Sequence, residues 1–598
     1  MKEKIKKILE KKSFHYFLIV FFSSLICIPL LSKTINLYQD DGVQHICRLM
    51  GTMQSIEENP VFPVIMSNFC NGFGYSWNLF YSIATAYVPL LFKLFGASYV
   101  GCIKLFIYAI TILSGFTMYE FTKRVTKKPN TALLAAIFYI LLPYRLTDMY
   151  MRIAIAELAS FIFLPMVFHG IYAIFEDSQK DEQEKKHMSI ILIVGTVGLF
   201  LTHTVITLYT AIFAFLYLIL QCRKINRKVI LRLGISLLIV LLLTAFFWVP
   251  LLEHKMATEY EVFQEGRMSR VDVLAYYKLS FSQLLFTQNG GRIFEIGLLL
   301  IIGSIFAVRA IYKEKLNQTE QNHTIFFLIL GIVCTFLTLR IFPFEKLPDL
   351  LCMIQFTFRF LEFIGFFLSF TAAIGFTYLF RKFAIADVLI YGIIAVLLLV
   401  PLNRLLDYEE HGWTEEMLWP AFPVTEQTGR VHAGCASFEY LPTKAFENRT
   451  YLVEREDRTY CLKGSAKIEE EKNGTNLKME LQPETEELTL ELPYIYYLGY
   501  EVKIKGEEDA EEEWEKVSIQ ESENGFLSIN LSNLNQEETY LLEVSYPGTA
   551  GMKISYGVSV ISFVALVGYW LFTEKKSFKR KTDKNLTKFR ESDKISKR

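Results

Sequence analysis

Residues 188–221 read MSIILIVGTVGLFLTHTVITLYTAIFAFLYLILQ, two apolar runs that meet at a single histidine, His203. Neither run contains Asp, Glu, Lys or Arg. A bilayer core about 30 Å thick is crossed by an apolar helix of roughly 20 residues. Runs of this kind recur along most of the 598-residue chain, which is 52% hydrophobic and contains 51 Phe. The sequence therefore predicts a polytopic α-helical membrane protein.

The spans are predicted from these runs. They are expected at about 14–32, 98–119, 131–144, 155–174, 188–202, 204–221, 229–250, 293–311, 324–342, 359–380, 384–401 and 553–572. A further apolar stretch, 76–95, is ambiguous. Its Trp77, Tyr81 and Tyr87 suit the membrane interface, so we interpret this stretch as an interfacial or re-entrant helix.

The basic residues indicate how the chain is oriented. Loops on the cytoplasmic side of a membrane carry an excess of Lys and Arg. With 76–95 left out of the spans, one side receives the basic clusters at 2–12, 123–128, 185–186, 223–228, 313–315, 381–382 and 575–581. If 76–95 crossed the bilayer, the loops among them would face outward. About twelve spans are therefore predicted, in a plasma-membrane protein with both termini in the cytoplasm.

The segment 402–552 is polar and differs from the rest of the chain. Its apolar residues alternate with polar ones, as in half-buried strands, at 477–481, 488–492, 502–504, 527–531 and 542–546. Asn473-Gly474 and Asn524-Gly525 are turn signals between these runs. A small extracytoplasmic β-sandwich is therefore expected before the last helix. Cys435 and Cys461 lie in this segment and could form a disulfide.

The predicted organisation follows from these observations. Residues 1–401 form the multi-span domain, with a first outer loop at 33–97. The β-rich segment 402–552 is followed by the last helix, 553–572, and by a basic cytoplasmic tail, 573–598.

Polar and ionisable residues gather near the predicted outer face. An ionisable group at membrane depth is costly, so each is by default a candidate for function. The candidates are Asp40, Asp41, His45 and Arg48 after the first span, Arg145, Asp148, Arg152 and Glu157 after the third, His203 at an outer turn, Glu253 and His254 after the seventh, and Gln355, Arg359 and Glu362 near the start of the tenth. Each also has a structural alternative, as a helix cap, a salt bridge, an interhelical hydrogen bond or a snorkelling side chain.

The set of side chains limits the chemistry. Paired carboxylates offer a general base or a cation site. Arginines near the membrane surface suit a phosphate, which a guanidinium group binds in a bidentate manner. A lipid-phosphate substrate used outside the cell meets both requirements. The chain has no Walker loop, HExxH or GxSxG motif, so ATPase, zinc protease and serine hydrolase functions lack support.

Several short motifs of the sequence resemble those of a known superfamily. They are Asp40-Asp41-Gly42 with His45, Pro143-Tyr144-Arg145 with Asp148 and Glu157, Leu201-Thr202-His203, and the segment from Gln355 to Arg359. An acidic pair in a long outer loop after the first span resembles the C-type (GT-C) membrane glycosyltransferases. More narrowly, the order of these motifs is similar to that of bacterial YfhO-like membrane proteins.

The resemblance implies a transferase that moves a sugar from a polyprenyl-phosphate donor to an envelope acceptor, such as a teichoic acid or another surface glycopolymer. Asp40 or Asp41 would be the general base. Arg145, Arg152 and Arg359 would hold the departing phosphate, while His203 and Gln355 would orient the substrate. His45, Asp148 and Glu157 complete the expected binding site. A divalent cation stays open, because some GT-C enzymes use one and others none.

Two other functions fit parts of the pattern. A transporter or flippase of a lipid-linked envelope precursor would also use many spans and an outer polar cavity, although no repeated halves are evident. A scaffold for envelope assembly would use the β-rich domain to bind proteins. Membrane lipids are expected partners in every case, and nucleic acid is not.

Overall fold

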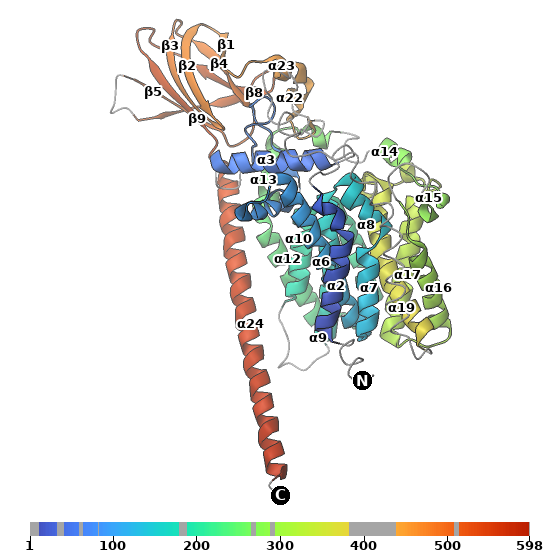
Figure 1. Ribbon diagram of the computed structural model, residues 1–598. Helices are drawn as coiled ribbons and strands as arrows, with labels where there is room; N and C mark the ends of the chain where they lie inside the picture. Colours follow the sequence, from blue (N-terminus) through green and yellow to red (C-terminus); the bar gives the residue numbers. More distant parts are fainter. Residues whose placement is uncertain are drawn as a thin grey trace.

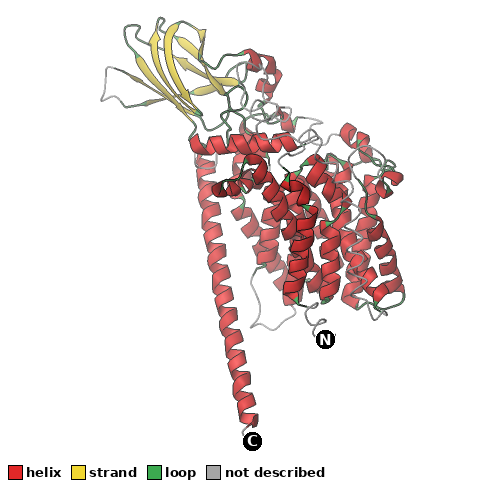
Figure 2. Cartoon of the chain, viewed as in Figure 1, coloured by secondary structure: helices red, strands yellow, loops and turns green. Residues whose placement is uncertain are grey.

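The computed structural model describes residues 11–32, 41–58, 64–81, 83–178, 188–264, 271–286, 294–381, 438–507 and 513–596. Helices make up most of this part, and the strands form a separate group at one end of the helix bundle (Figures 1 and 2). The last helix, α24 (Ala550–Ser596), runs alongside the bundle from the foot of the sheets (Figure 1).

Several described helices are long and apolar enough to cross a membrane. Five meet this condition singly: α6 (Tyr99–Thr126), α9 (Ile155–Ser178), α17 (Gln318–Thr338), the stretch Thr357–Phe380 with α19 (Phe360–Phe380), and the first part of α24, Ala550–Thr573. In α24 only 11% of the apolar window is buried, and Ile561 and Phe572 are among its most exposed side chains. Contiguous exposed apolar surface of this kind marks contact with a membrane.

Two more spans are possible as bent helix pairs. One pair is α7 (Pro129–Ile140) with the segment Pro143–Arg152, bent by 42°, and the other is α12 (Arg227–Leu243) with α13 (Ala245–Ala257), bent by 67°. Counting each pair as one span gives up to seven. Shorter apolar helices are α2 (Lys12–Ile26), α10 (Ile190–Thr202), α11 (Thr204–Leu220) and α16 (Leu298–Tyr312).

These helices agree in position with the predicted spans. Every predicted span overlaps an apolar helix, except 384–401, which lies outside the described residues. The number of twelve spans stays a prediction, because several of the overlapping helices are shorter than the roughly 20 residues that a bilayer core requires.

The stretch 76–95 is not the single helix that the sequence suggested. It is broken after α4 (Trp77–Phe80), while α5 (Ala84–Tyr87) and η2 (Pro89–Phe95) continue into each other as one apolar helix, Ala84–Phe95. None of these pieces is long enough to cross a bilayer core by itself. The longer α3 (Gly42–Glu58) follows Asp41 and lies across the end of the bundle, below the sheets (Figure 1).

The bundle is packed around α9 and α19. Helix α19 contacts α16, α17 and α7, and α9 contacts α6 and α10. The backbones of α16 and α19 approach closely where a Cβ on Gly375 would lie 1.8 Å from the carbonyl oxygen of Gly303. Small residues of this kind let membrane helices pack closely. Both α9 and α19 begin at the same end of the bundle, where the candidate site lies (Figure 1).

Several short helices connect or cap these elements. They are η1 (Ile28–Leu31), η5 (Cys222–Lys224), η6 (Glu261–Phe263), α14 (Val271–Tyr276), α15 (Phe281–Leu285), η7 (Phe344–Lys346), α18 (Asp349–Cys352), α22 (Thr443–Glu447) and α23 (Arg449–Glu454).

The strands form two antiparallel sheets. One has the order β1-β4-β8-β7 and the other β2-β3-β9-β5-β6. The strands are β1 (Tyr460–Lys463), β2 (Ala466–Asn473), β3 (Asn476–Pro483), β4 (Leu488–Ile495), β5 (Glu501–Gly506), β6 (Glu515–Val517), β7 (Ile519–Glu521), β8 (Phe526–Leu531) and β9 (Tyr540–Ser545). Apolar residues of both sheets belong to the buried core, as the alternation in the sequence indicated.

The predicted turns lie where the strands reverse. Asn473-Gly474 joins β2 to β3, and Asn524-Gly525 joins β7 to β8. Residues 402–437 lie outside the described residues, and Cys435 is among them, so its pairing with Cys461 stays a prediction.

The β-rich part is attached to the first outer loop by buried contacts. Phe73 of that loop accepts a hydrogen bond from Ile495 N to its carbonyl oxygen at 3.0 Å. Its ring lies 5.3 Å from the guanidinium group of Arg455, which pairs with Glu491 at 3.3 Å. The rings of Tyr460 and Phe526 also face Arg455. Phe73, through its carbonyl oxygen and its ring over Arg455, therefore joins the loop that leads away from α3 to the β-rich part.

We expect the variant Arg455→Met to lower the stability of the full-length protein by about 3–5 kcal/mol, because it leaves the Glu491 carboxylate buried without its counterion. Both side chains of this pair are 0% exposed. Thermal unfolding in detergent measures the effect. The matched control is Lys463→Met, which breaks the exposed Lys463–Glu487 pair and should leave the stability nearly unchanged. Equal effects of the two variants would contradict the expectation.

The predicted orientation can be tested with a native cysteine. Cys222 is the exposed member of the cysteines in the described residues, and it lies in the predicted cytoplasmic loop 222–228. On intact cells, a membrane-impermeant maleimide should leave Cys222 unlabelled. It should label an introduced cysteine at Lys463, which is 66% exposed on the β-rich part. Permeabilised cells and the variant Cys222→Ser are the controls. External labelling of Cys222 would overturn the orientation.

Candidate functional site

The candidate site is formed where the chain turns from α8 (Pro143–Thr147) into α9. Between these helices, Asp148–Arg152 is a π-helical turn, and Ile153 follows in the left-handed region with φ of 53°. A β-branched residue is strained there. Wide π-turns and strained residues recur at functional sites, where the surroundings hold them in place. This turn brings Asp148, Arg152 and Glu157 together although they do not share one helical face.

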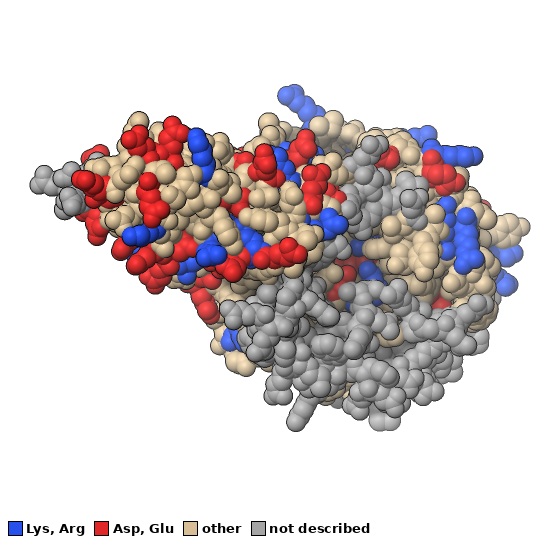
Figure 3. All heavy atoms as spheres, turned by 90° about the horizontal axis from the view of Figure 1, so that it is seen from above, with Lys and Arg blue, Asp and Glu red and all other residues tan. Residues whose placement is uncertain are grey.

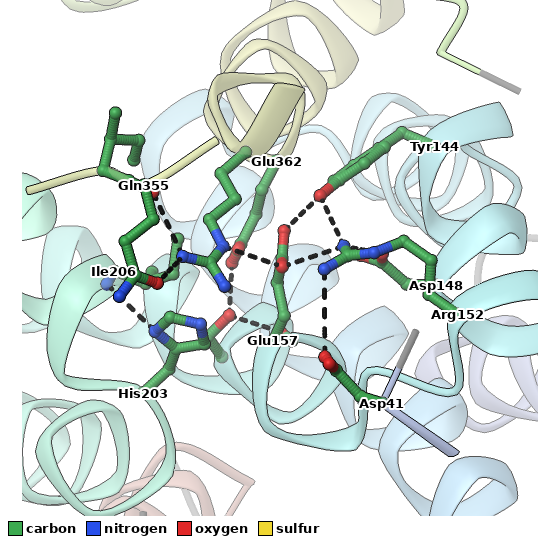
Figure 4. A network of polar contacts seen from close by, with 12 residues as sticks. Asp41, Tyr144, Asp148, Arg152, Glu157, His203, Ile206, Gln355 and Glu362 are labelled. Atoms are coloured by element: carbon green, nitrogen blue, oxygen red, sulfur yellow. Dashed lines mark hydrogen bonds and ion pairs between the residues drawn. The ribbon is translucent and has the colours of Figure 1, made fainter. Parts of the chain in front are cut away.

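Arg152 is the centre of a buried polar network (Figure 4). Its Nη1 atom donates to Asp148 Oδ1 at 2.5 Å, to Glu157 Oε2 at 3.1 Å and to Tyr144 OH at 3.0 Å. Tyr144 in turn donates a hydrogen bond to the other oxygen of Glu157. Arg152, Asp148 and Glu157 are 2%, 0% and 1% exposed. Buried charges are tolerated only when they are paired in this way.

Glu157 connects this network to a second arginine. Its Oε2 atom lies 3.3 Å from Nε of Arg359, the residue that precedes α19. Arg359 Nη1 donates to Gln355 Oε1 at 2.5 Å and to Ile354 O at 3.1 Å. Gln355 is another non-glycine residue with positive φ, 65°. For Arg359 Nη2, the structure records no acceptor among the described residues, which leaves this donor available for a ligand.

Asp41 lies at the accessible edge of the network. Its Oδ2 atom is 3.9 Å from Arg152 Nη2, and its side chain is 34% exposed. Its backbone N–H donates to Arg152 O at 3.1 Å, which fixes the start of α3 against the strained turn. In the view from above, acidic and basic atoms are seen together in a hollow next to the β-rich part (Figure 3). Asp41 therefore combines partial exposure with contact to a buried guanidinium group.

Two helices direct their N-terminal ends at this network. Glu157 lies in the first turn of α9, and Glu362 lies in the first turn of α19. The positive end of a helix dipole favours negative charge at such positions. Glu362 Oε1 accepts a hydrogen bond from Ser160 at 2.6 Å, and Glu362 is fully buried. The same helix ends would favour a bound anion.

Aromatic rings cover the arginines. The Phe358 ring lies 4.9 Å from the Arg152 guanidinium group, and the Phe356 ring lies 4.8 Å from that of Arg359. The two rings stack on each other with centroids 5.1 Å apart. Rings placed over guanidinium groups stabilise the charge and exclude water from it. The segment Gln355–Arg359 therefore supplies both a donor and its apolar cover.

Three predicted residues lie apart from the ion pairs: His203, Arg145 and His45. His203 precedes α11 and accepts a hydrogen bond at Nδ1 from Ile206 N, at 3.3 Å; its ring faces Gln355 in Figure 4. Arg145 is fully buried, donates to Thr111 at 3.3 Å and stacks on Phe161 at 4.8 Å. No ion pair between Arg145 and a carboxylate is recorded in the described part of the chain.

His45 lies on α3 and is buried, with its ring 6.2 Å from that of Tyr81. Burial, with Arg48 and Arg152 nearby, lowers the pKa of His45 to about 3. Its imidazole is therefore neutral at physiological pH. Asp40 lies outside the described residues, so its role as a base beside Asp41 stays a prediction.

Some members of the network were not assigned to the site from sequence. Tyr144 appeared only as part of the motif Pro143-Tyr144-Arg145, and Glu362 only among the polar residues of the predicted outer face. The position of Glu362 inside an apolar run was a signal for it. Phe356 and Phe358 lie inside the segment Gln355–Arg359 that the sequence singled out, although no role was assigned to their rings. Ser160 carried no signal, because serine is common in apolar helices.

Metal ligation was left open by the sequence. Within the residues that the structure describes, no group of three or more His, Cys, Asp or Glu side chains is placed to hold a metal ion. Asp40 lies outside that part of the chain. A divalent cation therefore stays an untested expectation.

Comparisons with known proteins give partial matches. Residues 86–344, less than half of the chain, match the model of a family of unknown function, DUF6541. A relative from Lactococcus lactis subsp. cremoris (strain MG1363), described as an uncharacterized protein, is 25% identical over 358 residues. The match covers 56% of this chain and 55% of the relative, so the chain spans about half of the relative that it matches.

Among solved structures, the arabinofuranosyltransferase AftD from Mycobacteria is similar at a TM-score of 0.41 and 13% identity. The match covers 66% of this chain and 26% of AftD, and a likeness at this level carries no argument about activity. The resemblance to YfhO-like proteins is not confirmed by these matches. The similarity to the DUF6541 family lies in the membrane part of the chain, and the two sheets lie outside it.

Proposed function

We propose that the chain is an integral-membrane glycosyltransferase of the GT-C type. It would move a sugar from a polyprenyl-phosphate donor to an acceptor of the cell envelope, on the side of the membrane where the sheets lie. One observation carries the proposal: a partly exposed carboxylate, Asp41, lies 3.9 Å from a buried arginine, and Glu157 connects that arginine to a second one. A base beside paired guanidinium groups suits transfer from a phosphate leaving group.

Each part of the network has a step in the proposed reaction. Asp41, or Asp40, takes the proton from the acceptor hydroxyl while the hydroxyl oxygen attacks the sugar carbon. The bond to the phosphate breaks, with inversion at that carbon, and negative charge grows on the leaving polyprenyl phosphate. Arg359 Nη2 and Arg152 stabilise that charge, and the buried Arg145 adds positive potential. Glu157 keeps the two arginines aligned.

His203 and Gln355 would orient the donor. His203 already uses Nδ1 as an acceptor for Ile206 N, so its other ring nitrogen carries the proton and can donate to a sugar hydroxyl. Gln355 holds Arg359 Nη1 through its side-chain oxygen, which fixes the direction of the guanidinium group. The aromatic cover from Phe356 and Phe358 suits an isoprenoid chain or a sugar ring.

A transfer assay tests the proposal against its alternative. The purified full-length protein would be given a synthetic polyprenyl-phosphate sugar, labelled in the sugar, together with cell-envelope glycopolymer. We expect label in the polymer and release of free polyprenyl phosphate. A flippase would instead move the intact donor across a liposome membrane without releasing polyprenyl phosphate. Movement of the intact donor without transfer of the sugar would show that the protein is a transporter and not a glycosyltransferase.

A further inference from the structure

A second polar pocket lies near the far end of α9 from the candidate site. Glu157 is in the first turn of this helix, whereas Ile174 and Asp177 near its end line the pocket. Twenty-four residues of α-helix span about 36 Å, so the two sites are well separated. The space open to the centre of a water-sized sphere is about 80 Å³. A water needs roughly 10–15 Å³ by this measure, so a phosphate group fits.

Arg232 lines this pocket and is the main reason to expect a ligand there. The residue is 7% exposed, on α12. Among the described residues, the structure records no hydrogen bond or ion pair from its guanidinium group. A buried charge without a partner is strongly disfavoured, so such groups are found with a bound counterion or ligand.

The N-terminus of α10 faces the same pocket. Ser189, Ile190 and Ile191 line it, and α10 begins at Ile190 and runs for 13 residues. Ser189 Oγ accepts a hydrogen bond from Leu192 N at 3.3 Å, and Ser189 N donates to Ser236 Oγ at 3.1 Å. The first N–H groups of a helix have no acceptor within it, and its dipole is positive at this end. Both features favour a bound anion.

Among the described residues, the charges at the pocket leave an excess of positive charge. Arg124 lines the pocket and pairs with Glu176 at 2.9 Å and with Asp177 at 3.4 Å. Lys127 pairs with Glu176 as well, at 3.0 Å. The two carboxylates are thus offset by Arg124 and Lys127, and the charge of Arg232 remains. Asp177 also disfavours an anion that approaches from its side, which directs the anion towards Arg232 and the end of α10.

Apolar surface continues from the pocket along the helices. Ile230 and Leu231 beside Arg232 are 61% and 62% exposed, and Val194 on α10 is 41% exposed. Exposed side chains of this kind on a membrane helix suit contact with acyl chains. Basic pockets between membrane helices bind the headgroups of anionic lipids.

We propose that this pocket binds the phosphate of an anionic phospholipid, held by Arg232 and the N-terminus of α10, with the acyl chains along α10 and α12. On the predicted topology this is the cytoplasmic leaflet. A free phosphate ion shares the recognition chemistry, but it would gain nothing from the exposed apolar surface beside Arg232.

Binding of short-chain phosphatidylglycerol to the purified full-length protein in detergent tests the proposal. We expect saturable binding, and we expect Arg232→Gln to weaken it by about tenfold or more, because charge-assisted hydrogen bonds are lost. Arg232→Lys keeps the charge and should retain most of the affinity. The matched control is Arg227→Gln, which removes an exposed arginine from the same helix outside the pocket and should change the affinity less than twofold.

Three further measurements separate the outcomes. Phosphatidylcholine of the same chain length should bind weakly, and equal binding of the two lipids would overturn recognition of an anion. Inorganic phosphate should compete only at far higher concentration, and competition at the concentration of the lipid would overturn the lipid as the ligand. Equal binding by the wild type and by Arg232→Gln, with both eluting as the same folded species in size-exclusion chromatography, would overturn the site itself.

Discussion

Replacing Arg152 with methionine is expected to slow sugar transfer strongly and to destabilise the protein. The change leaves Asp148 buried without its guanidinium partner and removes one of the two arginines that pair with Glu157. Breaking a buried ion pair costs about 3–5 kcal/mol. Loss of a group that stabilises charge in the transition state lowers the rate by roughly 10²–10³-fold. Thermal unfolding in detergent and the transfer assay measure the two effects.

A double variant separates the catalytic role of Arg152 from its structural role. Arg152→Met together with Asp148→Asn removes the carboxylate that the single variant leaves unpaired. We expect this combination to recover much of the lost stability, since a buried amide costs far less than a buried charge. Transfer should stay at the level of the single variant. Recovery of transfer together with stability would show that Arg152 serves only as a counterion.

The fold could be predicted from sequence where one signal dominates. Apolar length located the helices, and alternation located strands such as β3 and β4, because each pattern depends on nearby residues. The position of the helix break within residues 76–95 was not predictable in the same way. Composition marked this stretch as apolar, but the break at Tyr81, which separates α4 from the helix Ala84–Phe95, lies where the chain packs against α3 and α6, and local composition does not encode such packing.

The charged centre of the candidate site was predictable from sequence, but its connections were not. The cost of charge at membrane depth singled out Arg152, Glu157 and Arg359, which are far apart in the sequence yet meet in one network. Arg152 and Glu157 are five residues apart, a spacing that need not place them on one face of a regular helix. The π-turn and the strained Ile153 bring them together, and local sequence gives little indication of a π-turn. Arg145 shows the converse, because its neighbours in sequence are in the network and it is not ion-paired with them.

The variant Asp41→Asn is expected to retain the fold and to lose transfer. Asp41 is 34% exposed and 3.9 Å from Arg152, so the change should cost under about 1 kcal/mol of stability. A general base contributes roughly 10²–10⁴-fold to a rate, so kcat should fall by that factor while KM for the donor changes little. Asp40→Asn, made separately, is the matched control. Loss of transfer in Asp40→Asn alone would move the base to Asp40 and leave Asp41 as the partner of Arg152. Wild-type rates in both variants would exclude Asp40 and Asp41 as the general base. They would also exclude the network as the source of a base, because no other carboxylate of the described network has comparable exposure.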